Sequence, residues 1–179
     1  MADNMFKCHY WYLNFWVLNF TTCYNVYMPI LQIDLKLINF FKRISMPVAR
    51  FGLFVVFFYF GILKVLGLSP ASGLVRALFK QTISFMSFDV FFLLFGLFEC
   101  LIGILFIIPR CERVVIPLLF VHMIATFMPL FILPEATWSS FLVPTLEGQY
   151  IIKNLVIIAA AVGIAAHLTP ISRDGMKGV

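Results

Sequence analysis

Long apolar runs separated by short polar segments are the main pattern along this chain. The most informative stretch, Phe88–Pro134, holds two such runs joined by the charged turn Arg110–Arg113. Each run has about 20 residues, which at 1.5 Å per residue can cross a hydrocarbon core of about 30 Å. Pro109 ends the first run directly before the turn. The pattern predicts a transmembrane hairpin whose turn lies in water.

Two further apolar runs flank this hairpin, one at about Val48–Leu68 and one at about Tyr150–Leu168. Between the first run and the hairpin, Gly73–Phe85 alternates apolar pairs with basic residues at helical spacing, which predicts a short interfacial helix. No segment shows the alternation of a membrane strand, so helices are expected rather than a barrel. We therefore predict an all-α fold, a four-helix transmembrane bundle.

Glycines within the predicted spans mark places where helices can approach closely. In the second span, Gly96 and Gly103 lie three residues before and four after Glu99, so they share its helix face. Gly61 lies three residues before Lys64 in the first span. We also expect close helix contacts at Gly52 and at Gly163.

The N-terminal 47 residues are predicted to form an extension that leads into the bundle. Residues 31–47 carry three basic side chains among apolar ones and resemble an amphipathic helix on the membrane surface. Residues 1–30 are dense in aromatic residues but interrupted by asparagines. Three alternatives stay open for them: an interfacial helix, a fifth span, or translated sequence upstream of a start at Met28 or Met46. The membrane domain would then comprise residues 48–168, followed by a tail, 169–179.

Composition agrees with this division and narrows the class of protein. Of the 179 residues, 63% are hydrophobic and only 12% are charged, which is typical of an integral membrane protein. The net charge of +5 lies mostly beside the apolar runs, so it indicates topology rather than nucleic-acid binding. The four cysteines form no CxxC pair and no zinc-like spacing with histidine, so neither a metal site nor a disulfide framework is predicted.

Basic residues are distributed unequally between the two predicted faces of the bundle. Arg76 and Lys80 lie on one face, with Lys153 just inside the last span. The other face holds eight basic residues: Lys36, Lys42, Arg43, Arg50, Arg110, Arg113, Arg173 and Lys177. Cytoplasmic loops carry the excess of Lys and Arg, so this second face and the C-terminus are predicted to be cytoplasmic.

Five ionisable residues fall inside or at the edge of the predicted spans, where charge is costly. Counting residues from the span ends places them in two layers. Glu99 and His122 share a layer near mid-membrane and are predicted to contact each other. Lys64, Asp89 and Lys153 fall in an outer layer, where the two lysines are predicted to line one pocket with Asp89 as counter-ion.

Two interpretations of these five residues compete. In the first, Glu99 and His122 satisfy each other and the two lysines extend separately to the membrane surface. In the second, all five line an intramembrane polar pocket that holds a proton, a quinone headgroup or a small anion. The residues do not decide between them.

Several segments carry a resemblance to a known family. They are RFGLFVVFFYFGILKVLGLSPAS from Arg50, LFGLFECLIGILFIIP around Glu99, the His122 segment, and EGQYIIKNLVII from Glu147. Their most particular features are G-x-x-K at Gly61–Lys64 and EGQY-x-x-KN at Glu147–Asn154. In these segments the chain resembles the DoxX-like membrane proteins, especially the branch of YkgB/RclC type.

The resemblance implies a four-helix protein of the bacterial inner membrane. Most members of such families have no assigned activity, and some are linked to thiosulfate–quinone oxidation or to oxidative or reactive-chlorine stress. We therefore expect an accessory subunit in redox or oxidative-stress physiology, with a membrane or redox protein as partner and a quinone or small acid as ligand. The alternatives are a small proton-coupled transporter and a structural partner of another membrane protein, and catalysis is neither predicted nor excluded.

Overall fold

A computed structural model describes the backbone of residues 3–83 and 85–169, and side chains from residue 31 onward. The chain divides into two compact units, residues 1–45 and 46–179. The predicted all-α fold is confirmed, and four helical segments are long and apolar enough to cross a membrane. These segments are Leu31–Val65, Phe88–Ile107, Glu112–Ile132 and Leu146–Ala165. The protein is thus a multi-pass membrane protein.

Helix α1 (Asp3–Val65) is continuous where the sequence predicts two separate elements. The predicted surface helix of residues 31–47 and the predicted first span both belong to it, and Pro47 does not interrupt it. Proline is tolerated in membrane helices when neighbouring groups satisfy the freed carbonyl. In the first unit, the side chains of residues 31–43 are exposed, apolar ones included. The alternatives for residues 1–30 depend on side chains outside the described residues.

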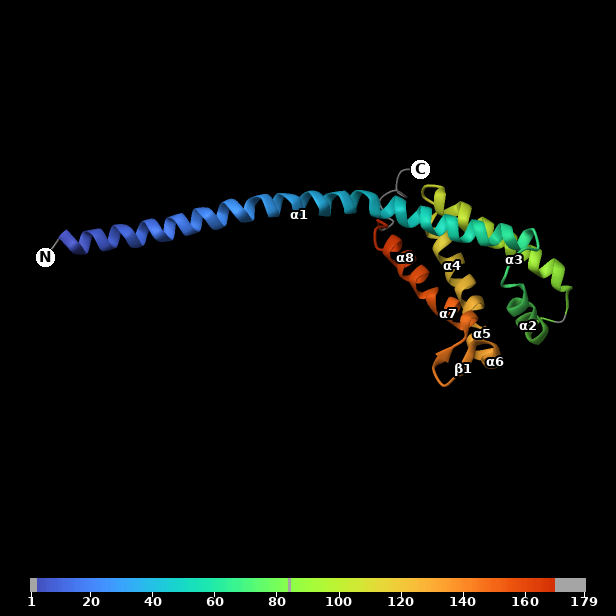
Figure 1. The fold of residues 1–179 in the computed structure, drawn as a ribbon. Helices are drawn as coiled ribbons and strands as arrows, with labels where there is room; N and C mark the ends of the chain where they lie inside the picture. Colours follow the sequence, from blue (N-terminus) through green and yellow to red (C-terminus); the bar gives the residue numbers. More distant parts are fainter. Residues whose placement is uncertain (1–2, 84, 170–179) are drawn as a thin grey trace, which may run out of the picture. The chain divides into compact units, whose positions relative to one another are not determined.

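The remaining elements all belong to the second unit (Figure 1). The helices are α2 (Ser72–Thr82), α3 (Phe88–Ile107), α4 (Glu112–Phe127), α5 (Pro129–Ile132), α6 (Pro134–Thr137), α7 (Leu146–Lys153) and α8 (Leu155–Ala165). Two short antiparallel strands, β1 (Trp138–Ser140) and β2 (Val143–Pro144), form a hairpin between α6 and α7. The predicted helix of residues 73–85 is α2, which begins and ends slightly earlier.

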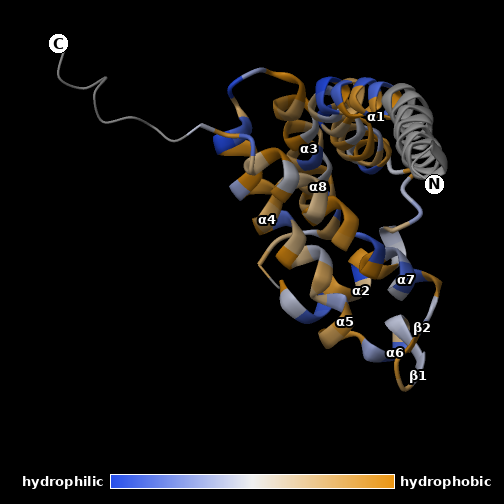
Figure 2. Ribbon diagram, turned by 90° about the vertical axis from the view of Figure 1, so that its left-hand side faces the viewer, coloured by the Kyte–Doolittle hydropathy of each residue, from blue (hydrophilic) through white to orange (hydrophobic). Residues whose placement is uncertain are grey.

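The core of the second unit lies where α4 packs against both α3 and α8. Its members are mostly aliphatic residues contributed by four helices: Leu53, Phe57, Ile102, Phe106, Val115, Ile116, Leu119, Met123, Ala161 and Ile164. The same helices expose many large apolar side chains, and the ribbons of α3, α4 and α8 in Figure 2 carry mostly the colours of hydrophobic residues. Helices that are apolar all round are typical of membrane spans.

Glycines bring the second-unit part of α1 and the antiparallel helix α3 into backbone contact. A Cβ placed on Gly61 would lie 2.8 Å from both the Cys100 nitrogen and the Gly96 oxygen, and one on Gly103 would lie 2.8 Å from the Phe58 nitrogen. Only glycine fits such a crossing. The predicted stripe of small residues is confirmed.

The expectation for two other glycines is wrong. Neither Gly52 nor Gly163 would bring a Cβ within 4 Å of another element among the described residues. Spacing alone does not tell which side of a helix faces its neighbour.

Candidate functional site

The crossing of α1 and α3 brings a lysine and a glutamate together in the interior. Lys64 lies one turn after Gly61 on α1, and Glu99 lies one turn after Gly96 on α3. A Cβ on Gly96 would lie only 2.9 Å from the Lys64 Cβ, so larger residues would separate the two helices at this point. The glycines therefore set the distance across which the charged side chains meet.

Lys64 and Glu99 form a buried ion pair. The Lys64 Nζ donates to Glu99 Oε2 over 2.5 Å, and each side chain is only 7% exposed. Because two isolated charges in such a place would each cost several kcal/mol, either residue alone would be strongly destabilising. Lys64 also lies in the last turn of α1, where a positive charge interacts favourably with the helix dipole.

His122 on α4 completes the cluster from the opposite side. Its Nε2 lies 3.3 Å from Glu99 Oε1, so the predicted contact between these two residues is confirmed. The imidazole ring packs edge-on against Phe57 and nearly parallel to Phe95, with ring centroids 5.4 and 5.1 Å away. Each oxygen of the Glu99 carboxyl thus has its own nitrogen partner. We call Lys64, Glu99 and His122 the central cluster.

One polar atom of the central cluster is left without a partner. The His122 Nδ1 is buried and makes no hydrogen bond within the described part of the chain, although the side chain as a whole is only 4% exposed. An unsatisfied buried polar group costs about 1–3 kcal/mol. Such a cost at the centre of a membrane protein is a reason to look for a ligand.

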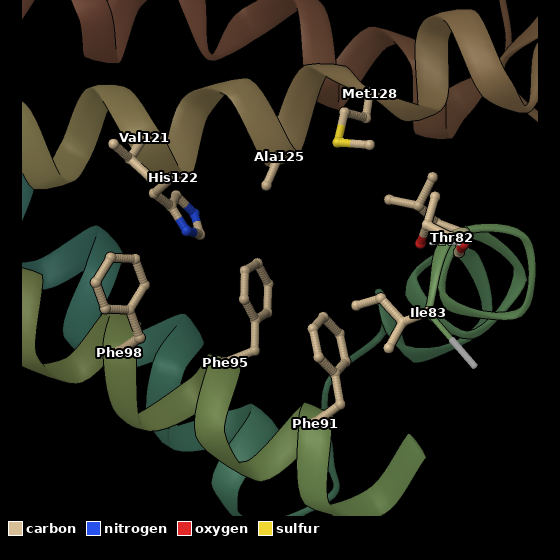
Figure 3. Close-up of a pocket in the computed structure, with 10 residues that line it drawn as sticks. Thr82, Ile83, Phe91, Phe95, Phe98, Val121, His122, Ala125 and Met128 are labelled. Carbon is tan, nitrogen blue, oxygen red and sulfur yellow. Dashed lines mark hydrogen bonds between the residues drawn. The ribbon is translucent and has the colours of Figure 1, made fainter. Parts of the chain in front are cut away.

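A cavity of about 300 Å³ lies beside this histidine. Figure 3 shows the imidazole directed from α4 into the space between α4, α3 and α2, facing the phenyl rings of α3. Apart from His122 and Thr82, the lining is apolar: Leu78, Ile83, Phe91, Phe95, Phe98, Val121, Ala125 and Met128. The volume and the aromatic walls suit a single small ring-shaped molecule.

The structure corrects the predicted position of Lys64. The sequence predicts that Lys64 lies in an outer layer with Asp89 as counter-ion, but its partner is Glu99, about 16 Å along α3 from Phe88, where that helix begins. The prediction is wrong because it assumes that all spans end at one plane. Helix α1 instead ends opposite the middle of α3.

The other two predicted pocket residues lie outside the cluster. Asp89 is 91% exposed and its carboxyl lies 3.9 Å from Arg76 on α2. Lys153 is exposed, with its Nζ 5.3 Å from the centre of the Tyr150 ring on its own helix. The expected outer mouth with two lysines is therefore not formed.

A second polar cluster, which the sequence does not predict, lies at the C-terminal end of α3. Arg50 on α1 forms an ion pair with Glu112 at the start of α4, and its guanidinium donates to the carbonyls of Phe106 and Ile108, each over 2.8 Å. These carbonyls belong to the end of α3, where acceptors lack helical partners. We call Arg50 and Glu112 the terminal cluster. The sequence signal for this cluster is an arginine and a glutamate that flank neighbouring span ends.

Comparisons with protein-family models, with curated proteins and with solved structures found no significant match to this chain. The family resemblance carried by Gly61–Lys64 and Glu147–Asn154 therefore stays a prediction. The structure does explain part of the second segment. Gly148 packs so tightly beneath α6 that a Cβ would overlap the Thr137 oxygen, and the Thr145 side chain caps α7 by accepting from Gly148.

Proposed function

We propose that this protein is an accessory membrane subunit in redox or oxidative-stress physiology, and that it binds a quinone-type molecule beside His122. The observation that carries the proposal is the aromatic cavity ending at a buried imidazole with an unpartnered nitrogen. A quinone headgroup is a small ring with polar substituents, and it reaches such a site from the lipid.

The charge of the central cluster favours this ligand over a small acid, the other ligand expected from the sequence. Lys64 is already paired with Glu99, so the two charges cancel and no free cation faces the cavity from these residues. Three phenyl rings, whose faces carry partial negative charge, line the cavity, and apart from Thr82 and His122 its other lining residues are aliphatic or methionine. A neutral ring compound therefore fits better than an anion.

A proton-coupled transporter is supported less well. Transporters of this kind commonly use broken helices whose unwound backbone coordinates substrate or ion. Met128 separates α4 from α5 and Asn154 separates α7 from α8, but both keep right-handed helical angles, at φ/ψ of −51°/−41° and −64°/−12°. Neither junction unwinds a span.

Ligand binding can be tested by extracting the purified full-length protein with solvent and recording absorbance before and after borohydride reduction. We expect about one quinone per chain, or saturable binding of added decylubiquinone. Ala125→Phe fills the cavity and should abolish binding, whereas Ala159→Phe, on the exposed surface of α8, should not. Equal binding by both variants would contradict the proposal that the ligand binds in this cavity.

Location and orientation belong to the same proposal. We place the protein in a bacterial inner membrane with the terminal-cluster end and the C-terminus in the cytoplasm, because basic residues gather at that end. Reporter fusions to the C-terminus should be active only as cytoplasmic reporters. Activity of a periplasm-specific reporter would reverse the orientation.

A further inference from the structure

The hydrogen bonds of the central cluster determine which kind of polar group the cavity can accept. Lys64 Nζ donates to Glu99 Oε2 over 2.5 Å, and the carboxylate of this ion pair carries no hydrogen of its own, so Oε1, which faces His122, is an acceptor. The neighbouring His122 Nε2 must then supply the hydrogen of the 3.3 Å contact. Glu99 therefore fixes the tautomer of the imidazole.

The imidazole is also held in its neutral form. A protonated ring would add a second positive charge beside Lys64, with only one carboxylate between them and phenyl rings around. In a neutral imidazole with hydrogen on Nε2, the Nδ1 carries a lone pair and can only accept a hydrogen bond. This is the atom without a partner.

We infer that the cavity selects a ligand that donates a hydroxyl hydrogen to His122 Nδ1, and that the ligand belongs to the class of membrane-soluble phenols. The inference rests on the proposed function, since it specifies the ligand of the same site. A hydroxyl oxygen carries the required hydrogen. A carbonyl or ether oxygen has no hydrogen to donate, so it would place its own lone pair against the lone pair of Nδ1.

The ring of such a phenol is accommodated by the remaining wall. Phe91 and Phe95 line the cavity on α3 with their rings 5.7 Å apart and nearly parallel, and Phe98 lies one turn further along. Aromatic rings pack favourably in offset or edge-on arrangements at such distances. For the proposed redox role, this predicts that the reduced form of a quinone, which carries two phenolic hydroxyls, binds more tightly than the oxidised form.

A matched pair of ligands tests the inference: 4-butylphenol and its methyl ether, 4-butylanisole. Binding is measured to the full-length protein in detergent micelles, and the signal of the Ala125→Phe variant is subtracted as partitioning into the micelle. We expect the phenol to bind about three- to tenfold more tightly, the contribution of one neutral hydrogen bond. The His122→Phe variant should lose this preference. An ether that binds as tightly as the phenol overturns the inference.

Decylubiquinone, included as a third ligand, separates this inference from the proposed function. Binding of the quinone without a preference for the phenol overturns only the hydroxyl inference. Binding of none of the three ligands overturns both.

A second measurement leaves the cavity and the central cluster unchanged. Nitrogen NMR of protein labelled with ¹⁵N-histidine reports which ring nitrogen carries hydrogen. A His9→Asn, His167→Asn variant leaves His122 as the single signal. We expect hydrogen on Nε2 and a shift of the Nδ1 resonance when 4-butylphenol is added. Hydrogen on Nδ1 would overturn the inference.

Discussion

The terminal cluster and the central cluster both join α1 to the α3–α4 hairpin through an ion pair, but they differ in completeness. At the terminal cluster, Arg50 donates to a carboxylate and to carbonyls at the end of α3, and it lies partly exposed. At the central cluster, all three side chains are almost fully buried, and one nitrogen of His122 lacks a partner. A satisfied cluster is explained by stability alone, whereas an unsatisfied one beside a cavity points to a ligand.

The largest expected effect comes from stranding a charge in the central cluster. Glu99→Leu leaves Lys64 buried without its counter-ion and should lower the free energy of unfolding by about 3–5 kcal/mol. Adding Lys64→Met to Glu99→Leu should recover most of this loss, because no lone charge is left. Thermal unfolding in detergent measures both. Additive losses would mean that the two side chains do not interact.

The next effect comes from the helix crossing beneath the central cluster. Gly61→Ala places a methyl group 2.7 Å from Cys100 Sγ and should cost about 1–3 kcal/mol through overpacking. Gly52→Ala, on the same helix, meets nothing within 4 Å and should be neutral or slightly stabilising. Similar unfolding temperatures for the two variants would contradict the tight crossing.

A smaller effect is expected at the terminal cluster. Arg50→Lys keeps the charge but loses the planar fork that reaches both Glu112 and the carbonyls, so stability should fall by about 1–2 kcal/mol. Decylubiquinone binding should not change, because the terminal cluster has no part in the cavity. Arg43→Lys, at an exposed position, is the control and should alter neither quantity. Weaker decylubiquinone binding by the Arg50→Lys variant would contradict the view that only the central cluster takes part in binding.

The smallest stability change is expected for His122→Phe. The Glu99 carboxyl loses one hydrogen bond but keeps its ion pair with Lys64, and the unsatisfied Nδ1 is removed. The free energy of unfolding should therefore change by less than about 1.5 kcal/mol. Affinity for 4-butylphenol should nevertheless fall about three- to tenfold in the micelle binding assay, because the acceptor Nδ1 is lost. A large loss of stability with unchanged binding would assign His122 a structural role only.

The fold and two of the three residues of the central cluster could be predicted from sequence for specific reasons. Glu99 and His122 lie in the two arms of one hairpin, so counting from a shared turn places them at equal depth, and they do meet. Span length and apolar content similarly sufficed for the four helical segments. These inferences depend only on the rise per residue.

Lys64 and Arg50 were misjudged because their partners depend on how α1 is staggered against α3. That stagger is set by Gly61, Gly96 and Gly103, whose facing partners cannot be read from spacing. Without that stagger, the sequence predicts a depth for Lys64 only from a common plane of span ends, and it predicts for Arg50 only a position beside a span end. The cavity depends further on α2, which packs through Phe79 against the first turns of α3.

Arg50 and Lys64 together fix the position of α1 along the α3–α4 hairpin. They are 14 residues apart, close to four full turns, so both point to nearly the same side of α1. The two side chains lie about 21 Å apart along α1, and each forms an ion pair with the α3–α4 hairpin. A shift of α1 by a single turn along its axis would break both ion pairs at once. Inserting one residue between them would rotate one of the two side chains by about 100° around the helix axis, away from its ion-pair partner. The length of this segment is therefore as constrained as its composition, although its intervening residues are almost all apolar.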